Sequence, residues 1–358
     1  MIKNIFLRKG IKDTLFYSLS ILLGRSLTIL VIPYLLIKLS LKEIAYYDVF
    51  LLGTNYMQLF LLLGIDSGIA VKIAEFRDDK EKLNLYFSIS LWIVLCMTLI
   101  FLILGYLFWF FTEFELTFIV LLYVQGVLVT LQYVIYNYFK WLGKSKISSF
   151  LMFFGYSLGV IIGIILINID TPSLYMFILG MIIGNLVGVV VCFLFSRTYI
   201  VFSFNKGLYS ELKDILSISL PIFFNSLVNQ SYKSIDRFMI LYFFNENLLG
   251  IYSLIIRVCQ IPIMGIEVML SSFQAITFIN YKDKESNKLY NKLLEANFLL
   301  ASVLVLLFTV SVYFSVSFFS EIHVIKDHIY LLPIVFLSVY FISMKNFGGF
   351  SYYIYKKT

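Results

Sequence analysis

Ionisable side chains interrupt one long apolar stretch of this sequence, residues 215–258. They are Lys233, Asp236, Arg237 and Arg257. Placing a charge inside a bilayer costs about 2.5–3.5 kcal/mol on insertion scales, so such residues are kept where they face a polar interior. The first three lie three and four residues apart and therefore share one face of a helix. We expect this face to line a water-filled cavity.

Uncharged polar side chains extend the same stripe by one and two helical turns toward the N-terminus. They are Asn225, Ser226, Asn229 and Gln230. A polar stripe on an otherwise apolar span is typical of a helix that borders a wet path through the membrane.

Cations outnumber acids at membrane depth along the whole chain. Arg25 and Lys345 join the three basic residues above, and Arg25 has no nearby acid in its own span. Such an interior suits an anionic headgroup such as pyrophosphate, whose oxygens Arg can bind in a bidentate manner. We therefore predict that Arg25, Lys233, Arg237 and Arg257 line the substrate cavity. Alternatively, Asp236 pairs with Lys233 or Arg237 and fixes the helix, and both roles can hold together.

The intramembrane acids have two interpretations each. Glu267 lies beside Pro262 and could be a protonatable coupling group, because proton relays in membranes use such acids. It could equally be a charge partner for Arg257, although ten residues of one helix separate the two. Asp236 is likewise either a coupling group or a charge partner. Asp48 and Asp66 lie nearer the interfaces, where Asp66 is expected to be solvated.

The composition places the chain in the membrane. It has 358 residues, of which 61% are hydrophobic and 14% charged, and its mean hydropathy is +0.92. Soluble domains are about 45–50% apolar and about 25% charged, so a soluble protein is excluded. The three cysteines lie in apolar spans without metal or redox spacing, and both histidines lie in one loop. We expect no metal and no cofactor.

The apolar pattern predicts an all-α polytopic membrane protein with about ten transmembrane helices. The expected spans are 14–37, 44–65, 85–111, 116–139, 147–169, 172–196, 215–244, 248–276, 296–320 and 329–355. Lys and Arg concentrate at both termini and in alternate loops, which places the N- and C-termini in the cytoplasm. The net charge of +7 then follows from topology and does not indicate a nucleic-acid partner.

An internal repeat predicts two lobes. LSLKEIAYYDVF (39–50) and FNENLLGIYSLI (244–255) both close one span and open the next. An even number of spans separates the copies, so the repeat is parallel and the substrate path is expected between the lobes. The predicted lobes are 1–205, with six helices, and 206–358, with four. The second lobe is therefore expected to be short by two helices, either because the chain is truncated or because this lobe is naturally incomplete.

Two glycine ladders are expected to pack helices within the first lobe, because small residues four apart let helices approach closely. They are Gly155–Gly159–Gly163 and Gly180–Gly184–Gly188.

Several motifs, in this order, resemble one transporter family. They are LGIDSGIAVKIAE (63–75), LSISLPIFFNSL (216–227), SIDRFMI (234–240), GIYSLIIRV (250–258) and YYIYKKT (352–358). They are similar to the oligosaccharide flippases, the Wzx-like O-antigen translocases (polysaccharide biosynthesis proteins) of the multidrug/oligosaccharidyl-lipid/polysaccharide (MOP) exporter superfamily. The family has twelve to fourteen spans, so the chain departs from it by lacking the last pair.

The resemblance implies a MATE-like fold of two lobes around a V-shaped cavity that opens alternately to each side. It further implies that an undecaprenyl-pyrophosphate-linked oligosaccharide repeat unit is flipped across the bacterial inner membrane for O-antigen (lipopolysaccharide), capsule or exopolysaccharide assembly. Polysaccharide polymerase and chain-length machinery would be partners. No glycosidic bond is made or broken, so the expected protein is a transporter and not an enzyme.

Two other functions compete with this one. A multidrug cation antiporter of the same superfamily should line its cavity with acids and aromatics, whereas the predicted cavity here is basic. A polytopic O-antigen polymerase or glycosyltransferase needs a large outer loop that bears catalytic groups, whereas the longest predicted outer segment is about 320–328.

Overall fold

The computed structural model of this protein is helical wherever it describes extended stretches of chain. These stretches are residues 34–76, 78–111, 115–169, 172–200 and 208–257, accompanied by a few isolated positions. The helices are α2 (Leu41–Leu62), α3 (Ile65–Glu75), α4 (Lys80–Phe111), α5 (Leu116–Trp141), α6 (Ser145–Ile169), α7 (Leu174–Ser196), the 3₁₀ turn η1 (Arg197–Tyr199) and α8 (Leu208–Phe243).

Four helices among the described residues, α4 to α7 with η1 appended to α7, are long and apolar enough to cross a membrane. α2 and α3 form a fifth span if they are counted together as one span that is broken by a bend of 50°. The prediction of a polytopic membrane protein is therefore confirmed. The total of ten spans stays a prediction. α8, which contains most of the expected span 215–244, is not among these apolar helices. The expected spans 14–37, 248–276, 296–320 and 329–355 lie wholly or largely outside the described residues.

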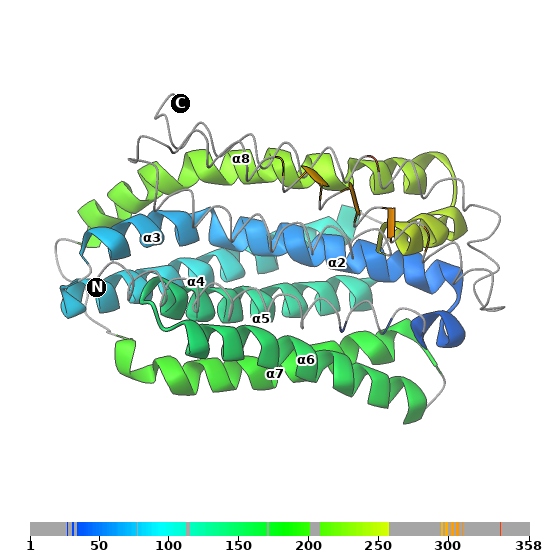
Figure 1. Cartoon of the computed structure of the whole chain (residues 1–358), viewed down its shortest axis with the longest axis horizontal. Coiled ribbons are helices and arrows are strands. Elements are labelled where there is room, and N and C mark those ends of the chain that lie inside the picture. The colour runs from blue at the N-terminus through cyan, green and yellow to red at the C-terminus, as the bar shows by residue number, and fades with distance from the viewer. Residues whose placement is uncertain are drawn as a thin grey trace. The chain divides into compact units, whose positions relative to one another are not determined.

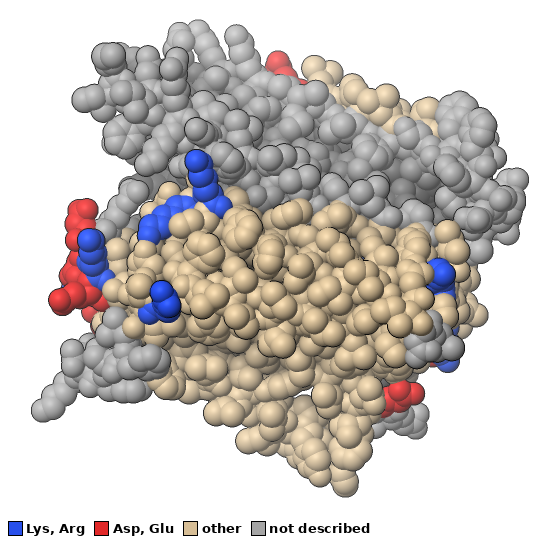
Figure 2. Space-filling view, turned by 90° about the horizontal axis from the view of Figure 1, so that it is seen from below, with Lys and Arg blue, Asp and Glu red and all other residues tan. Residues whose placement is uncertain are grey.

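The helices of residues 38–246 pack in successive layers (Figure 1). α8 lies against α2 and α3, these pack on α4 and α5, and α5 also contacts α6 and α7. Lys and Arg side chains gather toward the two ends of the face in Figure 2, and a broad band without them lies between. This distribution is that of a helical bundle surrounded by lipid, with its charges in the headgroup regions.

The chain divides into two compact units, residues 38–246 and residues 1–37 with 247–358. Nearly all the described structure belongs to the first unit, and the account below concerns it unless stated otherwise. The lobe boundary predicted at residue 205 stays a prediction. Within the described unit, α8 packs against helices that precede this boundary.

The start of α2 is fixed by a capping box. The Ser40 hydroxyl accepts from the backbone N–H of Glu43, and the Glu43 carboxylate accepts from the N–H of Ser40 at 2.9 Å. Two otherwise unpaired donors at the helix start are thereby satisfied. The second carboxylate oxygen of Glu43 accepts from the N–H of Leu174 at 3.2 Å, so the same residue joins the starts of α2 and α7.

The break between α2 and α3 was not predicted from the sequence. Leu63 and Gly64 both take left-handed backbone conformations, with φ of 48° and 72°. A Cβ on Gly64 would lie 2.4 Å from the carbonyl oxygen of Ser219 in α8, so glycine also permits the close approach of α8. The segment 70–84, expected as a loop, is instead mostly helical: α3 continues to Glu75 and α4 begins at Lys80.

The glycine ladders join α6 to α7 as expected. A Cβ on Gly180 would lie 2.3 Å from the Cα of Gly163, and a Cβ on Gly184 would lie 2.2 Å from the Cα of Gly159. At the next step, Gln132 of α5 lies beside both Gly155 and Gly188. The two helices therefore meet backbone to backbone.

Replacing Gly184 by leucine should destabilise the folded protein. The added side chain would have to displace the backbone of α6, and overpacking of this kind costs about 1–3 kcal/mol. We expect a fall of several degrees in the thermal unfolding midpoint in detergent. Gly105→Leu is the matched control, because a Cβ on Gly105 meets no atom within 4 Å. Equal midpoints for the two variants would contradict the ladder.

Candidate functional site

α8 has three faces of different character. One face packs on α2 and α3 and is buried; a second is exposed and apolar, with Phe224, Val228 and Met239 between 51% and 67% exposed. The third is exposed and polar and carries Asn225, Asn229 and Lys233, here called the exposed polar row. At 100° per residue the three side chains of this row span only about 80° of the helix circumference.

The buried face of α8 joins α2 through hydroxyl contacts. The Tyr56 hydroxyl lies 2.7 Å from the Ser234 hydroxyl and 3.3 Å from that of Ser231. Ser234 is fully buried and donates to the Gln230 carbonyl at 2.9 Å. One turn along α2, the Phe60 ring packs against Phe223 with 5.6 Å between centroids. The contact therefore combines apolar packing with paired polar groups.

The strongest charge interaction of this face is a buried ion pair. Arg237 Nε lies 3.1 Å from Asp48 Oδ2, and both side chains are 10% exposed or less. The two atoms are in ionic contact without the alignment of a hydrogen bond. Arg237 also donates from Nη1 to the carbonyl of Lys233. Asp48 of α2 is thus the acid that neutralises Arg237.

The sequence suggested that Asp236 forms a side-chain ion pair with Lys233 or Arg237. In the structure its carboxylate accepts a hydrogen bond from the backbone N–H of Arg237 at 2.8 Å, a contact with the main chain. Asp236 is half-buried and lies beside the exposed polar row.

Lys233 is placed unlike Arg237, although one helical turn separates them. Its side chain is exposed, and it forms no ion pair with the acidic residues that the structure describes. One turn back, the Asn229 amide donates to the Asn225 amide oxygen at 3.3 Å. The predicted stripe is therefore divided: its exposed part ends in Lys233, which has no ion pair within the described part of the chain, while Arg237 belongs to the packed part.

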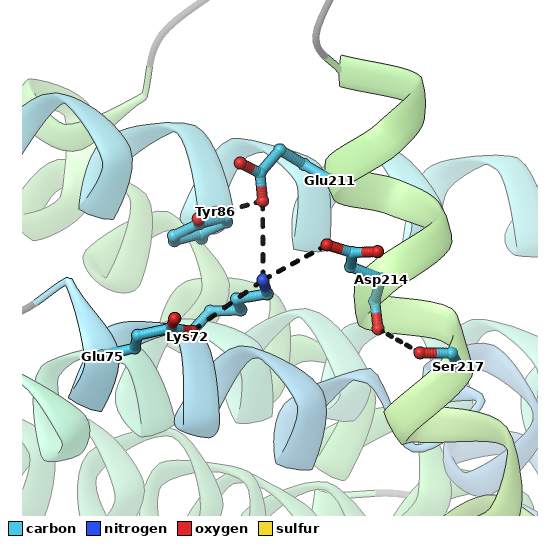
Figure 3. Close-up of polar contacts among 6 residues, drawn as sticks. All are labelled: Lys72, Glu75, Tyr86, Glu211, Asp214 and Ser217. Atoms are coloured by element: carbon cyan, nitrogen blue, oxygen red, sulfur yellow. Dashed lines mark hydrogen bonds and ion pairs between the residues drawn. The ribbon is translucent and has the colours of Figure 1, made fainter.

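A second charged cluster lies where α3 ends and α8 begins (Figure 3). Lys72 Nζ lies 3.6 Å from a carboxylate oxygen of Asp214, 3.8 Å from Glu211 and 3.9 Å from Glu75. The Tyr86 hydroxyl of α4 donates to Glu211 at 3.0 Å. These residues come from α3, α4 and α8, so the cluster joins three helices at one end of the bundle. The Lys72 side chain at its centre is only 12% exposed.

Polar contacts also link the other ends of α2 and α8. Glu246, in the turn after α8, forms an ion pair with Lys42 at 2.8 Å and accepts from the Tyr46 hydroxyl at 2.7 Å. The hydrogen bond from Lys42, followed by that from Tyr46, holds the pKa of the Glu246 carboxyl below its ordinary value of 4.5.

The other predicted site residues have separate outcomes. Arg25 and Glu267 lie outside the described residues, so their roles stay predictions. Arg257, of the other unit, is 5% exposed. Asp66 is half-buried and accepts from the Tyr133 hydroxyl at 3.0 Å. We expected Asp66 to be solvated, and the structure shows that it also has a tyrosine hydroxyl as a hydrogen-bond donor.

Sequence reasoning missed the partners that α2 and α3 supply to α8. Asp48 stood out as an acid in an apolar span, which is the signal that could have led to Arg237. Lys72 and its three acids carried no comparable signal, because charged residues at helix ends are ordinarily solvated.

The fold is that of a MATE-type membrane transporter. A MATE crystal structure in complex with MaL6 matches 95% of this chain and 84% of its own, with 17% identity and a TM-score of 0.65. DinF-BH, a MATE multidrug transporter, matches 95% and 81%, with 15% identity and a TM-score of 0.68. A MOP superfamily transporter from Pyrococcus furiosus, described as having a binding pocket of reverse polarity, matches 95% and 84%, with 17% identity and a TM-score of 0.63.

At the level of sequence the assignment becomes more specific. Residues 11–273 match the family described as Polysaccharide biosynthesis protein, and the chain belongs to that family. Comparison with curated proteins gives no match. The resemblance to polysaccharide biosynthesis proteins noted from the sequence motifs is confirmed, and the protein is a multi-pass membrane protein with a MATE-like fold.

Removing one member of the buried ion pair should destabilise the bundle more than removing both. Asp48→Asn leaves the Arg237 charge buried without its acid, a change that typically costs about 3–5 kcal/mol. The double variant Asp48→Leu/Arg237→Met contains neither charge and should recover much of this loss. Thermal unfolding in detergent measures both. If the double variant were no more stable than Asp48→Asn, the ion pair would not be the cause.

The contact at Glu246 should depend on pH. Because its folded-state pKa is lowered, its contribution is fully present above the unfolded value near 4.5 and is lost as the pH falls through the folded value. Wild type should therefore unfold at a slightly higher temperature than Glu246→Gln at pH 7, and the difference should shrink progressively as the pH falls below 4.5. A difference between the two that stayed constant down to the acid limit of folding would contradict the role of the Glu246 carboxylate.

Proposed function

We propose that this protein flips an undecaprenyl-pyrophosphate-linked oligosaccharide repeat unit across the bacterial inner membrane by alternating access. The product would supply O-antigen, capsule or exopolysaccharide assembly. The proposed setting is the plasma membrane with both termini in the cytoplasm, and the polymerase and chain-length machinery are proposed partners.

The observation that carries this proposal is the exposed polar row of α8. A lysine without an acidic partner among the described residues is exposed there, on a helix that otherwise exposes apolar side chains. A cation at membrane depth needs an anion or water to offset its desolvation, and a pyrophosphate headgroup provides two phosphates. Lys233 is therefore the proposed primary headgroup ligand.

The other predicted cations have supporting roles in this proposal. Arg237 contributes positive potential beside Lys233, although Asp48 offsets part of it. Arg25 and Arg257 remain proposed cavity cations. Asp236 and Glu267 remain proposed coupling groups or charge partners, and a proton gradient would act through them.

A multidrug cation antiporter is the second candidate, because the structural relatives include MATE multidrug transporters. Against it stands the charge of the row, since an exposed, unneutralised lysine repels a cationic drug. A polymerase or glycosyltransferase is less well supported. The predicted outer connections of this unit run from the end of α4 at Phe111 to Leu116 and from the end of α6 at Ile169 to Leu174, and they are too short for a catalytic loop.

Lys233→Gln should abolish most polysaccharide export. In a bacterium lacking its own O-antigen flippase, the wild-type chain should restore surface polysaccharide, and the variant should restore less than about a tenth of it. The loss of a charge-assisted contact, about 1.5–3 kcal/mol, accounts for this factor. Lys233→Arg should retain most export. Surface polysaccharide is measured by immunoblot and normalised to membrane-inserted protein.

Lys146→Gln is the matched control, because Lys146 is an exposed lysine at the start of α6, away from the row. Full export by Lys233→Gln would overturn the proposed headgroup role. Drug resistance conferred by the wild-type chain, without any restored polysaccharide, would instead favour the antiporter.

A further inference from the structure

The two amides of the exposed polar row have no role in headgroup binding. Asn225 and Asn229 are exposed on α8, at helical turns that precede Lys233. By contrast, the buried amides of Gln132 and Asn185 bond to each other, with Gln132 Nε2 lying 3.2 Å from Asn185 Oδ1 and 2.6 Å from its main-chain oxygen. The expected span 215–244 places Asn225 and Asn229 at membrane depth, where exposed polar groups require a polar partner other than lipid.

The spacing of the row matches a headgroup with sugars attached. Four residues of α-helix rise about 6 Å, so Lys233, Asn229 and Asn225 follow one another in steps of about 6 Å along one edge of α8. A cation stands at one end and uncharged amides continue from it. This order corresponds to a phosphate followed by successive sugar rings.

The chemistry of the amides suits hydroxyl groups. An asparagine side chain both donates and accepts hydrogen bonds, as a sugar hydroxyl does, whereas a lysine only donates. The bond from Asn229 to Asn225 uses one donor hydrogen and one acceptor lone pair of the two groups. The remaining amide hydrogens and oxygen lone pairs can contact a ligand, while the mutual bond holds the two groups side by side.

We infer that Asn225 and Asn229 form a carbohydrate subsite that binds hydroxyls of the first sugars of the lipid-linked substrate. This inference rests on the proposed function and extends it: Lys233 binds the pyrophosphate, and the amide pair distinguishes a glycosylated carrier from the bare one. Bare carrier lipid would then be held too weakly to compete with the glycosylated substrate.

Binding of two defined lipids to the purified full chain tests the subsite. The probes are undecaprenyl pyrophosphate and undecaprenyl-pyrophosphoryl-N-acetylglucosamine, titrated in detergent micelles and followed by native mass spectrometry. Two hydrogen bonds of ordinary net strength predict that wild type binds the glycosylated probe about tenfold more tightly. Asn225→Ala/Asn229→Ala should reduce this ratio to near one and leave binding of the bare lipid unchanged.

Three further variants separate the subsite from the proposed function. Lys233→Gln should weaken both probes while keeping their ratio. Asn168→Ala is the matched control, since Asn168 is an exposed amide of α6 that donates to the Ile164 carbonyl of its own helix, and it should keep both affinities. Asn229→Ala alone, the milder change, should give an intermediate ratio, and thermal unfolding confirms that each variant is folded.

The outcomes point to different failures. Equal binding of the two probes by wild type, or an unchanged ratio in the double variant, would overturn the subsite while leaving headgroup binding intact. If wild type bound neither pyrophosphate lipid, the proposed function itself would fail, and the subsite with it.

Discussion

The contact of α8 with α2 and α3 depends on neutralising charge away from water. Arg237 is buried between α8 and α2, and Asp48 supplies the compensating charge at 3.1 Å. The Tyr56 contacts join α2 to α8 farther along these two helices. The Lys72 cluster joins α3 to the start of α8. Because a buried charge is costly without its partner, these polar contacts restrict the register in which α8 can pack.

Once α8 packs in this register, the orientation of its two other faces is also determined. The apolar face is exposed, and the exposed polar row is adjacent to the packed face. α6 and α7, joined by their glycine ladders, provide a rigid body that exposes apolar side chains. Among the described helices, α8 consequently exposes a row of polar side chains, whereas α6 and α7 expose mainly apolar ones.

Much of the fold follows from local pattern. The expected spans 116–139, 147–169 and 172–196 agree closely with α5, α6 and α7. Apolar length sets where a helix can cross a bilayer, and glycines four residues apart mark a close helix contact. The break at Leu63 and Gly64 was missed because the apolar pattern continues through it. The left-handed backbone at Gly64 and the close approach of Ser219 together explain the requirement for glycine there.

The sequence by itself determined that this is a polytopic membrane protein, where most of its helices lie, and that polar residues form a stripe on one of them. These properties depend on residues close together in the chain, whose periodicity is visible directly. Only the tertiary structure decided which cation of the stripe is neutralised. That outcome depends on which helix packs alongside: α2 brings Asp48 to Arg237, whereas Lys233, one turn away, is exposed and forms no ion pair with the acids that the structure describes.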